Sequence, residues 1–129
     1  MTRASGAFDV KVMPQTDADS VLSRMTLDKQ YHGDLDGTGK GQMLASGTEV
    51  KETGIYVALE KVTGTLHGKR GSFLLQHTGL MLRGTPNLTI TIVPDSGSDD
   101  LVGISGRMDI KIEAGGKHFY ELDYTLPSR

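Results

Sequence analysis

The feature that most constrains this chain is a period-2 alternation of apolar and polar residues, which recurs from one end to the other. No apolar stripe with the 3.6-residue period of a helix accompanies it, so strands must supply the core. The 17 glycines stand singly between apolar runs, which is typical of turns and bulges. The sequence therefore predicts an all-β protein.

Eight segments carry the alternation. Met13-Pro14 is expected to end the first of them, a polar connection with room for one helical turn follows at Gln15–Ser20, and loops are expected at Arg83–Asn87 and Pro94–Asp100. The expected strands are about Ser5–Val12, Leu22–Gly33, Gly39–Val50, Gly54–Leu66, Arg70–Leu82, Leu88–Val93, Ile104–Glu113 and Lys117–Leu126.

Three hairpins are predicted from turn chemistry. Asp36-Gly37 is a dipeptide typical of a type I′ turn, His67-Gly68 predicts a second tight turn, and Ala114–Gly116 predicts a three-residue loop. With that last loop, Ile110 pairs with Tyr120, Met108 with Leu122 and Arg107 with Asp123. Apolar residues then meet apolar ones and opposite charges meet, which specifies the register.

A chain of 129 residues forms one domain, here residues 1–129. Eight strands joined by short connections remove their exposed edges by closing on themselves, so we expect a closed antiparallel barrel with meander topology. A sandwich is the alternative. An eight-stranded barrel has an interior that side chains fill or that holds one small ligand.

The composition limits the classes of partner that this chain is expected to bind. The net charge of −2 comes from interspersed acids and bases, so nucleic acid is not an expected partner. No apolar run is long enough for a membrane span or a signal peptide, and the absence of cysteine suits a reducing cytoplasm. We therefore expect a soluble cytoplasmic protein.

The strongest candidate site lies on the fourth and fifth strands. If His67-Gly68 is a two-residue turn, Tyr56, Glu60 and His77 share the face that also carries Val62, Phe73 and Leu75. A glutamate among those apolar side chains needs a partner, which His77 or a tyrosine hydroxyl can supply. Such a pair could orient a ligand or move a proton, or it could be a satisfied polar network that plugs the barrel.

Other candidate ligand-binding residues depend on strand parity. A turn one residue longer would place Gln76 inward in place of His77, so both residues stay candidates. Tyr31, on the face of Met25 and Leu27, and Tyr124, beside Leu122 and Leu126, would bring hydroxyls into an apolar interior.

No metal site or cofactor is expected. His32, His67, His77 and His118 lack the i, i+2 spacing of strand ligands, and His67 and His118 are expected to be solvated. Asp34–Gly37 does not continue as a calcium loop, and no glycine-rich stretch joins a strand to a helix as a phosphate loop does.

The other face of the fourth strand is apolar as well, with Ile55, Val57 and Leu59. One barrel wall cannot bury both faces, and an exposed apolar stripe marks a partner surface. We therefore expect a homo-oligomer, a C₂ dimer first, unless the N-terminal segment or the Met13–Leu22 connection covers the stripe.

Several stretches resemble a small bacterial family of uncharacterised proteins with a domain-of-unknown-function label. They are Gly33–Gly39, Glu60–Gly79, Val93–Ser98, Leu101–Gly106 and Leu122–Leu126. The fold of that family resembles the barrel of allene oxide cyclase, which dirigent proteins share. The resemblance implies the barrel and no activity, and no motif carries over the active-site residues of allene oxide cyclase.

Three functions remain open. The first is a barrel that binds a small, mostly apolar ligand, oriented by the face of Tyr56, Glu60 and His77. The second is an enzyme of isomerase or cyclase type that uses Glu60 or His77 as general base on an apolar substrate. The third is a structural barrel with a filled interior. The volume of the interior distinguishes them.

Overall fold

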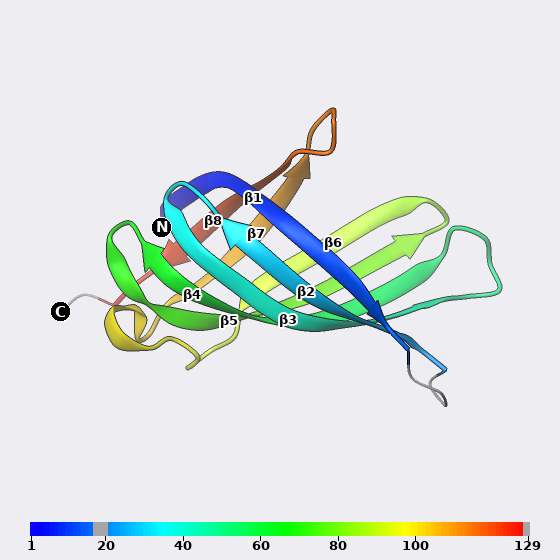
Figure 1. The fold of residues 1–129 in the computed structure, drawn as a ribbon, viewed down its shortest axis with the longest axis horizontal. Helices are drawn as coiled ribbons and strands as arrows, with labels where there is room; N and C mark the ends of the chain where they lie inside the picture. The colour runs from blue at the N-terminus through cyan, green and yellow to red at the C-terminus, as the bar shows by residue number, and fades with distance from the viewer. Residues whose placement is uncertain (17–20, 128–129) are drawn as a thin grey trace.

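A computed structural model describes residues 1–16 and 21–127 of the chain. The described residues form antiparallel strands that pair in sequence order, and β8 returns to pair with β1, as Figure 1 shows. The expected closed barrel with meander topology is confirmed. The elements are β1 (Thr2–Gln15), β2 (Ser23–Tyr31), β3 (Leu35–Gly47), β4 (Gly54–Leu66), β5 (Lys69–Leu82), β6 (Thr85–Ile92), the 3₁₀ turn η1 (Asp99–Leu101), β7 (Ser105–Ile112) and β8 (His118–Thr125).

Two hairpins form as their turn chemistry predicts. His67 and Gly68, with φ of 47° and 79°, make the two-residue turn between β4 and β5. The β7–β8 register also matches, with Met108 opposite Leu122 and Ile110 opposite Tyr120. Local turn residues and side-chain alternation are therefore enough to define these two pairings.

The predicted turn at Asp36-Gly37 is wrong. The β2–β3 connection is residues 32–34, with Gly33 at φ 97°, and both Asp36 and Gly37 are paired within the sheet. The Tyr120 hydroxyl fixes this connection: it accepts a hydrogen bond from the Leu35 amide at 2.9 Å and donates to the His32 carbonyl at 2.7 Å. A contact from β8 therefore helps to fix the residue at which β3 begins. At the other end of β3, residues 48–50, which were expected to belong to the strand, lie in the loop that follows it.

The expected breaks at two prolines are also wrong. β1 continues through Pro14, which pairs with Met25, and β6 includes Pro86, which pairs with Met81 after a two-residue turn at Arg83 and Gly84. Both prolines lie where the described pairing joins the strand to a single neighbour, and such edge stretches tolerate a missing amide. Of the polar connection expected at residues 15–20, Gln15 belongs to β1, and residues 17–20 lie outside the described residues.

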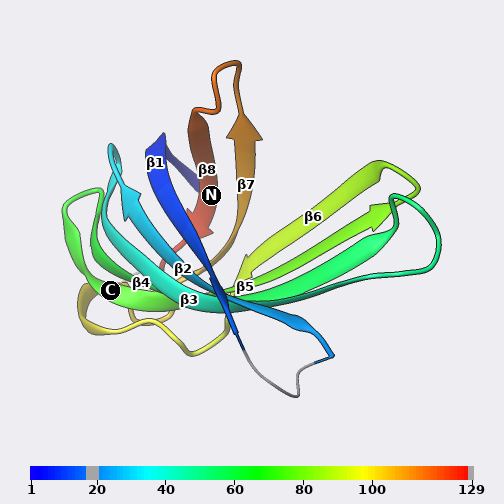
Figure 2. The same cartoon turned by 45° about the vertical axis from the view of Figure 1, so that its right-hand side comes forward.

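The barrel is narrowly joined between β6 and β7. The register there consists of Ile90 opposite Met108 and Thr91 opposite Arg107. Beyond these two pairs, β6 lies apart from the β7–β8 hairpin (Figure 2). The barrel is therefore wider at the end that carries the loop between β3 and β4. We call this end the open half and the opposite end the closed half.

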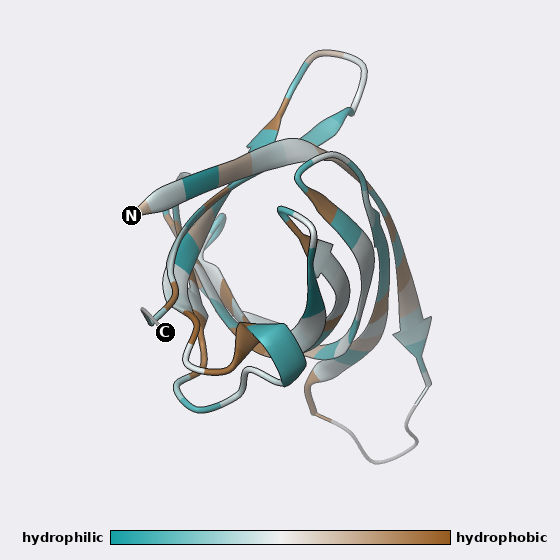
Figure 3. Cartoon of the chain, turned by 90° about the vertical axis from the view of Figure 1, so that its left-hand side faces the viewer, coloured by the Kyte–Doolittle hydropathy of each residue, from teal (hydrophilic) through white to brown (hydrophobic). Residues whose placement is uncertain are grey.

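The closed half holds the core. Leu35, Leu66, Phe73 and Leu122 are at most 1% exposed, and Leu101 of η1 packs over this end. Figure 3 views the molecule from the closed half, with the strands in a ring and η1 in front. The strands thus enclose a packed apolar core at one end of the barrel.

The outer face of β4 is exposed as expected, at 46% for Ile55, 46% for Val57 and 58% for Leu59. The described part of the N-terminal segment and of the β1–β2 connection therefore does not cover the stripe. No helix among residues 1–16 and 21–127 is long and apolar enough to cross a membrane.

Candidate functional site

A buried polar cluster lies between the two halves. The Glu60 carboxylate accepts hydrogen bonds at Oε1 from Lys29 Nζ (2.9 Å) and His77 Nε2 (2.9 Å), and at Oε2 from the Tyr31 hydroxyl (2.5 Å). Glu60 and Tyr31 are 0% exposed, His77 3% and Lys29 5%. We call Lys29, Tyr31, Glu60 and His77 the Glu60 cluster. Its carboxylate is fully partnered, as burial of a charge requires.

Strand register and one glycine position the cluster. Glu60 and His77 face inward from β4 and β5, and Lys29 and Tyr31 face inward from β2. The intervening strand β3 places Gly39 beneath the carboxylate, where a Cβ atom would lie 2.0 Å from Glu60 Oε2. A side chain at position 39 would collide with the carboxylate. The glycine therefore allows the side chains of β2 and β4 to form hydrogen bonds across β3.

The structure brings together some of the expected site residues and separates others. Tyr31 and His77 both contact Glu60, whereas Gln76 is exposed on the outer face, so the two-residue turn places His77 inward. Tyr124 is inward but lies in the closed half, where its hydroxyl is 2.5 Å from Nδ1 of His67.

His67 is exposed in the β4–β5 turn, as expected, and its Nε2 lies 3.6 Å from Asp34 Oδ2. The expectation that His118 is solvated is corrected. His118 is partly buried with its ring centroid 5.2 Å from that of Phe8. The described residues contain no group of His, Asp and Glu arranged to hold a metal ion.

Sequence reasoning missed Lys29. Its signal is the strand alternation, because Lys29 stands between Leu27 and Tyr31 on the apolar face of β2. A lysine at such a position predicts a buried carboxylate partner. In the structure, Lys29 Nζ also lies 5.1 Å from the centroid of the Phe8 ring, within the range of a cation–π contact.

The electrostatics of the cluster hold Glu60 ionised. Burial by itself raises the pKa of this carboxyl, but the hydrogen bond from His77, the charge of Lys29 and the Tyr31 hydroxyl together lower the pKa to about 2. Burial and the Glu60 charge in turn raise the pKa of Tyr31 well above its ordinary value. At neutral pH, Glu60 is therefore an anion that only accepts hydrogen bonds.

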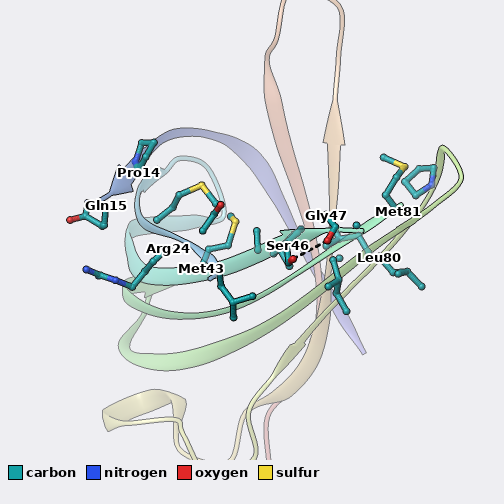
Figure 4. Close-up of a pocket in the computed structure, with 18 of the residues that line it drawn as sticks. Pro14, Gln15, Arg24, Met43, Ser46, Gly47, Leu80 and Met81 are labelled. Atoms are coloured by element: carbon teal, nitrogen blue, oxygen red, sulfur yellow. Dashed lines mark hydrogen bonds between the residues drawn. The ribbon is translucent and has the colours of Figure 1, made fainter. Parts of the chain in front are cut away.

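An open cleft of about 960 Å³ lies in the open half, and its described lining reaches Tyr56 and Gly79 but includes none of the Glu60 cluster. Figure 4 shows Pro14 and Gln15 of β1, Met43 of β3 and Met81 of β5 around it. Its inward-facing lining is mainly apolar and comprises Pro14, Met25, Met43, Ala45, Tyr56, Met81, Pro86 and Leu88. In this part of the barrel the side chains do not fill the interior.

Tyr56 connects the cleft to the Glu60 cluster. Its ring lies over the opposite residue Gly79, where a Cβ atom would be 2.1 Å from Tyr56 Cε1, so only glycine leaves room for it. Burial first, and then the charge of Glu60, raise the pKa of Tyr56. The hydroxyl therefore stays neutral at physiological pH. The Glu60 charge acts on it through space, without a direct hydrogen bond between Tyr56 and the cluster.

The chain resembles known proteins over nearly its whole length. Residues 4–124 match the family model described as "Protein of unknown function (DUF3224)". The crystal structure of a DUF3224 protein of unknown function from Shewanella oneidensis MR-1 is 43% identical, with a TM-score of 0.91, and the match covers 100% of this chain and 99% of that one.

No curated protein matches the chain. The likeness to allene oxide cyclase stays a prediction, whereas the family expected from sequence is confirmed. The chain belongs to the DUF3224 family of proteins of unknown function.

Proposed function

We propose that this protein binds a small, mostly apolar molecule in the cleft of the open half. The observation that carries the proposal is the unequal filling of the barrel, with a packed closed half and a cleft of about 960 Å³ in the open half. Ligand sites are concave and mainly apolar, with a few polar groups that fix orientation. A purely structural barrel would need no such space.

The lining suits an adaptable apolar site. Met25, Met43 and Met81 supply flexible, polarizable side chains, which fit varied apolar shapes. Tyr56 contributes a neutral hydroxyl to the cleft, and the hydrogen-bonded Glu60 cluster lies deeper in the barrel, beyond Tyr56 and Gly79. In this proposal Tyr56 orients the ligand, and Glu60 and His77 form the polar layer behind it.

Glu60 is poorly suited to the alternative role of general base. A general base works best with a pKa near the working pH, whereas the pKa of Glu60 is about 2. An isomerase or cyclase mechanism would have to rely on His77, and Glu60 would only position its ring. Binding needs no such step, so it is the function that the site supports best.

Titration with the neutral fluorescent dye Nile red tests the proposal. We expect saturable binding that Ala45→Trp weakens at least about tenfold, because the indole would occupy cleft volume beside Tyr56. Leu44→Trp is the matched control, since residue 44 is the next position along β3 and faces outward. It should change the affinity less than about twofold.

Two results would count against the proposal. One is the absence of saturable binding to the unmodified protein. The other is a loss of binding with Leu44→Trp but not with Ala45→Trp, which would place the dye on the outer face of β4.

A further inference from the structure

The chain exposes more surface than a compact monomer of its size. Its accessible surface is 8079 Å², whereas folded monomeric proteins of this mass expose about 6,700 Å². The excess is about 1,400 Å², and each partner in a standard stable interface buries about 800 Å². The fold therefore exposes enough extra surface for both an open cleft and an interface with a partner.

In the open half, the wall formed by β3, β4 and β5 is apolar on both faces. Its inward face lines the cleft, for example with Met43 and Met81. Its outward face carries aliphatic side chains that are between 38% and 58% exposed, namely Leu44, Ile55, Val57, Leu59 and Leu80. An antiparallel sheet that faces water on one side carries polar residues there. A ligand in the cleft covers only the inward face, so the outward face needs a cover of its own.

The register makes the outward side chains contiguous. Leu44 lies opposite Val57, and Ile55 lies opposite Leu80. A hollow of about 520 Å³, which we call the outer hollow, lies over Leu44, Val57 and Leu59. The rest of its outward-facing lining is Arg24, Gln42, Gln76 and Thr78. A contiguous exposed apolar patch marks an interaction surface.

The absence of a free charge in the outer hollow favours a second copy of this chain as the partner. Among the described lining residues Arg24 alone carries a fixed charge, and its Nη1 lies 3.3 Å from Gln42 Oε1. A partner chosen by opposite charge would find little to pair with here. A second copy presents the same uncharged apolar face, and an isologous contact about a twofold axis requires such a self-complementary surface.

Two lysines limit where the twofold axis can lie. Lys40 and Lys61 are exposed and opposite each other, at the next outward positions beyond Gln42 and Leu59 towards the closed half. An axis near Leu59 would bring the lysines of the two copies together. An axis at Val57 separates Lys61 of one copy from Lys61 of its partner by about 26 Å along the strands. The axis that avoids repulsion therefore passes close to Val57.

We infer that this protein forms a C₂ dimer in which the outward faces of β3, β4 and β5 pack face to face, with the twofold axis at Val57. The aliphatic side chains of both copies fill the outer hollows, and Gln42 and Gln76 lie in the polar rim. The sequence indicates only the stripe on β4, whereas the structure adds two neighbouring strands, the hollow and the axis. The cleft lies on the opposite face of the wall, so the dimer forms with or without a ligand.

Thiol cross-linking of single-cysteine variants tests the position of the axis, because the chain contains no cysteine. Packed sheets lie about 10 Å apart, so two cysteines at position 57 are within reach of the short cross-linker bismaleimidoethane. Thr63→Cys is the matched control, since Thr63 is exposed on the same face of the same strand. Its two copies would lie about 40 Å apart along the strands, so Val57→Cys should yield at least about tenfold more covalent dimer.

Sedimentation of the unmodified protein gives a second readout that does not depend on any variant. The interface contains no predicted ion pair, so its dissociation constant should change less than about threefold between about 0.05 M and about 0.5 M NaCl. An interface held by charges would weaken at least about tenfold over the same range.

Three results would overturn the inference. A monomer at the highest concentration would exclude the dimer. A dimer in which Val57→Cys cross-links no better than Thr63→Cys would place the interface elsewhere. A dimer that weakens strongly with salt would show that ion pairs hold it. None of these results bears on ligand binding in the cleft, which the Nile red titration tests separately.

Discussion

The two halves of the barrel are built from the same strands, yet their inward side chains differ in packing. In the closed half, Phe73 of β5 is 1% exposed, whereas Met81, further along the same face of that strand, is 41% exposed. In β6, Ile90 is 1% exposed and Leu88, the next inward position, is 40% exposed. The comparison indicates that the closed half supplies most of the packing, whereas the open half contains the space in which we propose that a ligand binds.

Large-to-small substitutions test this division most strongly. Phe73→Ala should lower the free energy of unfolding by about 3–5 kcal/mol, because it creates a cavity in a packed region. Met81→Ala, at the rim of the cleft, should cost less than about 0.5 kcal/mol. Urea unfolding of both variants measures the difference. Similar losses would show that the open half is packed as tightly as the closed one.

Removing Lys29 tests how much the Glu60 cluster, which lies between the two halves, contributes to stability. Lys29→Met should lower the free energy of unfolding by about 3 kcal/mol at neutral pH, because it leaves the buried Glu60 anion without its cation. Lys11→Met, at an exposed position of neighbouring β1, is the control and should change it by less than about 0.5 kcal/mol.

Adding Glu60→Gln to Lys29→Met removes the unpaired charge and should recover part of that loss. If the double variant is less stable by the sum of the two single effects, the pair is not coupled as described.

Acid pH should reduce the stabilisation that the Glu60 cluster provides. The pKa of Glu60 is about 2 in the fold against 4.5 as a model value, so its ionised form stabilises the fold above about pH 4.5, and this contribution is lost as the pH falls towards 2. Between about pH 6 and about pH 3, the unmodified protein should lose about 2 kcal/mol more than Glu60→Gln in urea unfolding. Equal losses in the two proteins would show that Glu60 has an ordinary pKa.

The smallest expected effect concerns the outer face of β4. The exposed stripe of Ile55, Val57 and Leu59 predicts a C₂ dimer, which Val57→Asp should weaken at least about tenfold by placing a charge in the interface. Thr125→Asp, exposed on β8, should leave the dimer unchanged. Sedimentation across a range of concentrations measures both, and a monomer at the highest concentration would contradict the expectation.

Local patterns in the sequence were enough for the parts of the site that lie on one hairpin. Strand alternation and the His67-Gly68 turn predict that Glu60 and His77 share one face, because both signals are properties of adjacent residues. The β7–β8 register was predictable for the same reason, since charged and apolar residues match across a short loop.

The remaining features depend on contacts between distant segments. Lys29 reaches Glu60 only because Gly39 of the intervening strand has no side chain, and the position of the β2–β3 turn depends on Tyr120. The size of the cleft depends on where β6 separates from β7, which no turn or alternation encodes. Pro14 and Pro86 lie on edge stretches, which only the strand pairing reveals, so the sequence wrongly predicts a strand end at Pro14 and a loop at Pro86.

Methionine methyl signals test the central claim most directly. The six methionines are distributed so that Met25, Met43 and Met81 line the cleft, whereas Met108 is 2% exposed in the core and Met13 is exposed on β1. In a titration of ¹³C-methyl-labelled protein with Nile red, we expect saturable shifts of the three cleft methyl groups and unchanged signals from Met108 and Met13. Shifts confined to Met13, or no saturable shift at all, would contradict a ligand site in the open half.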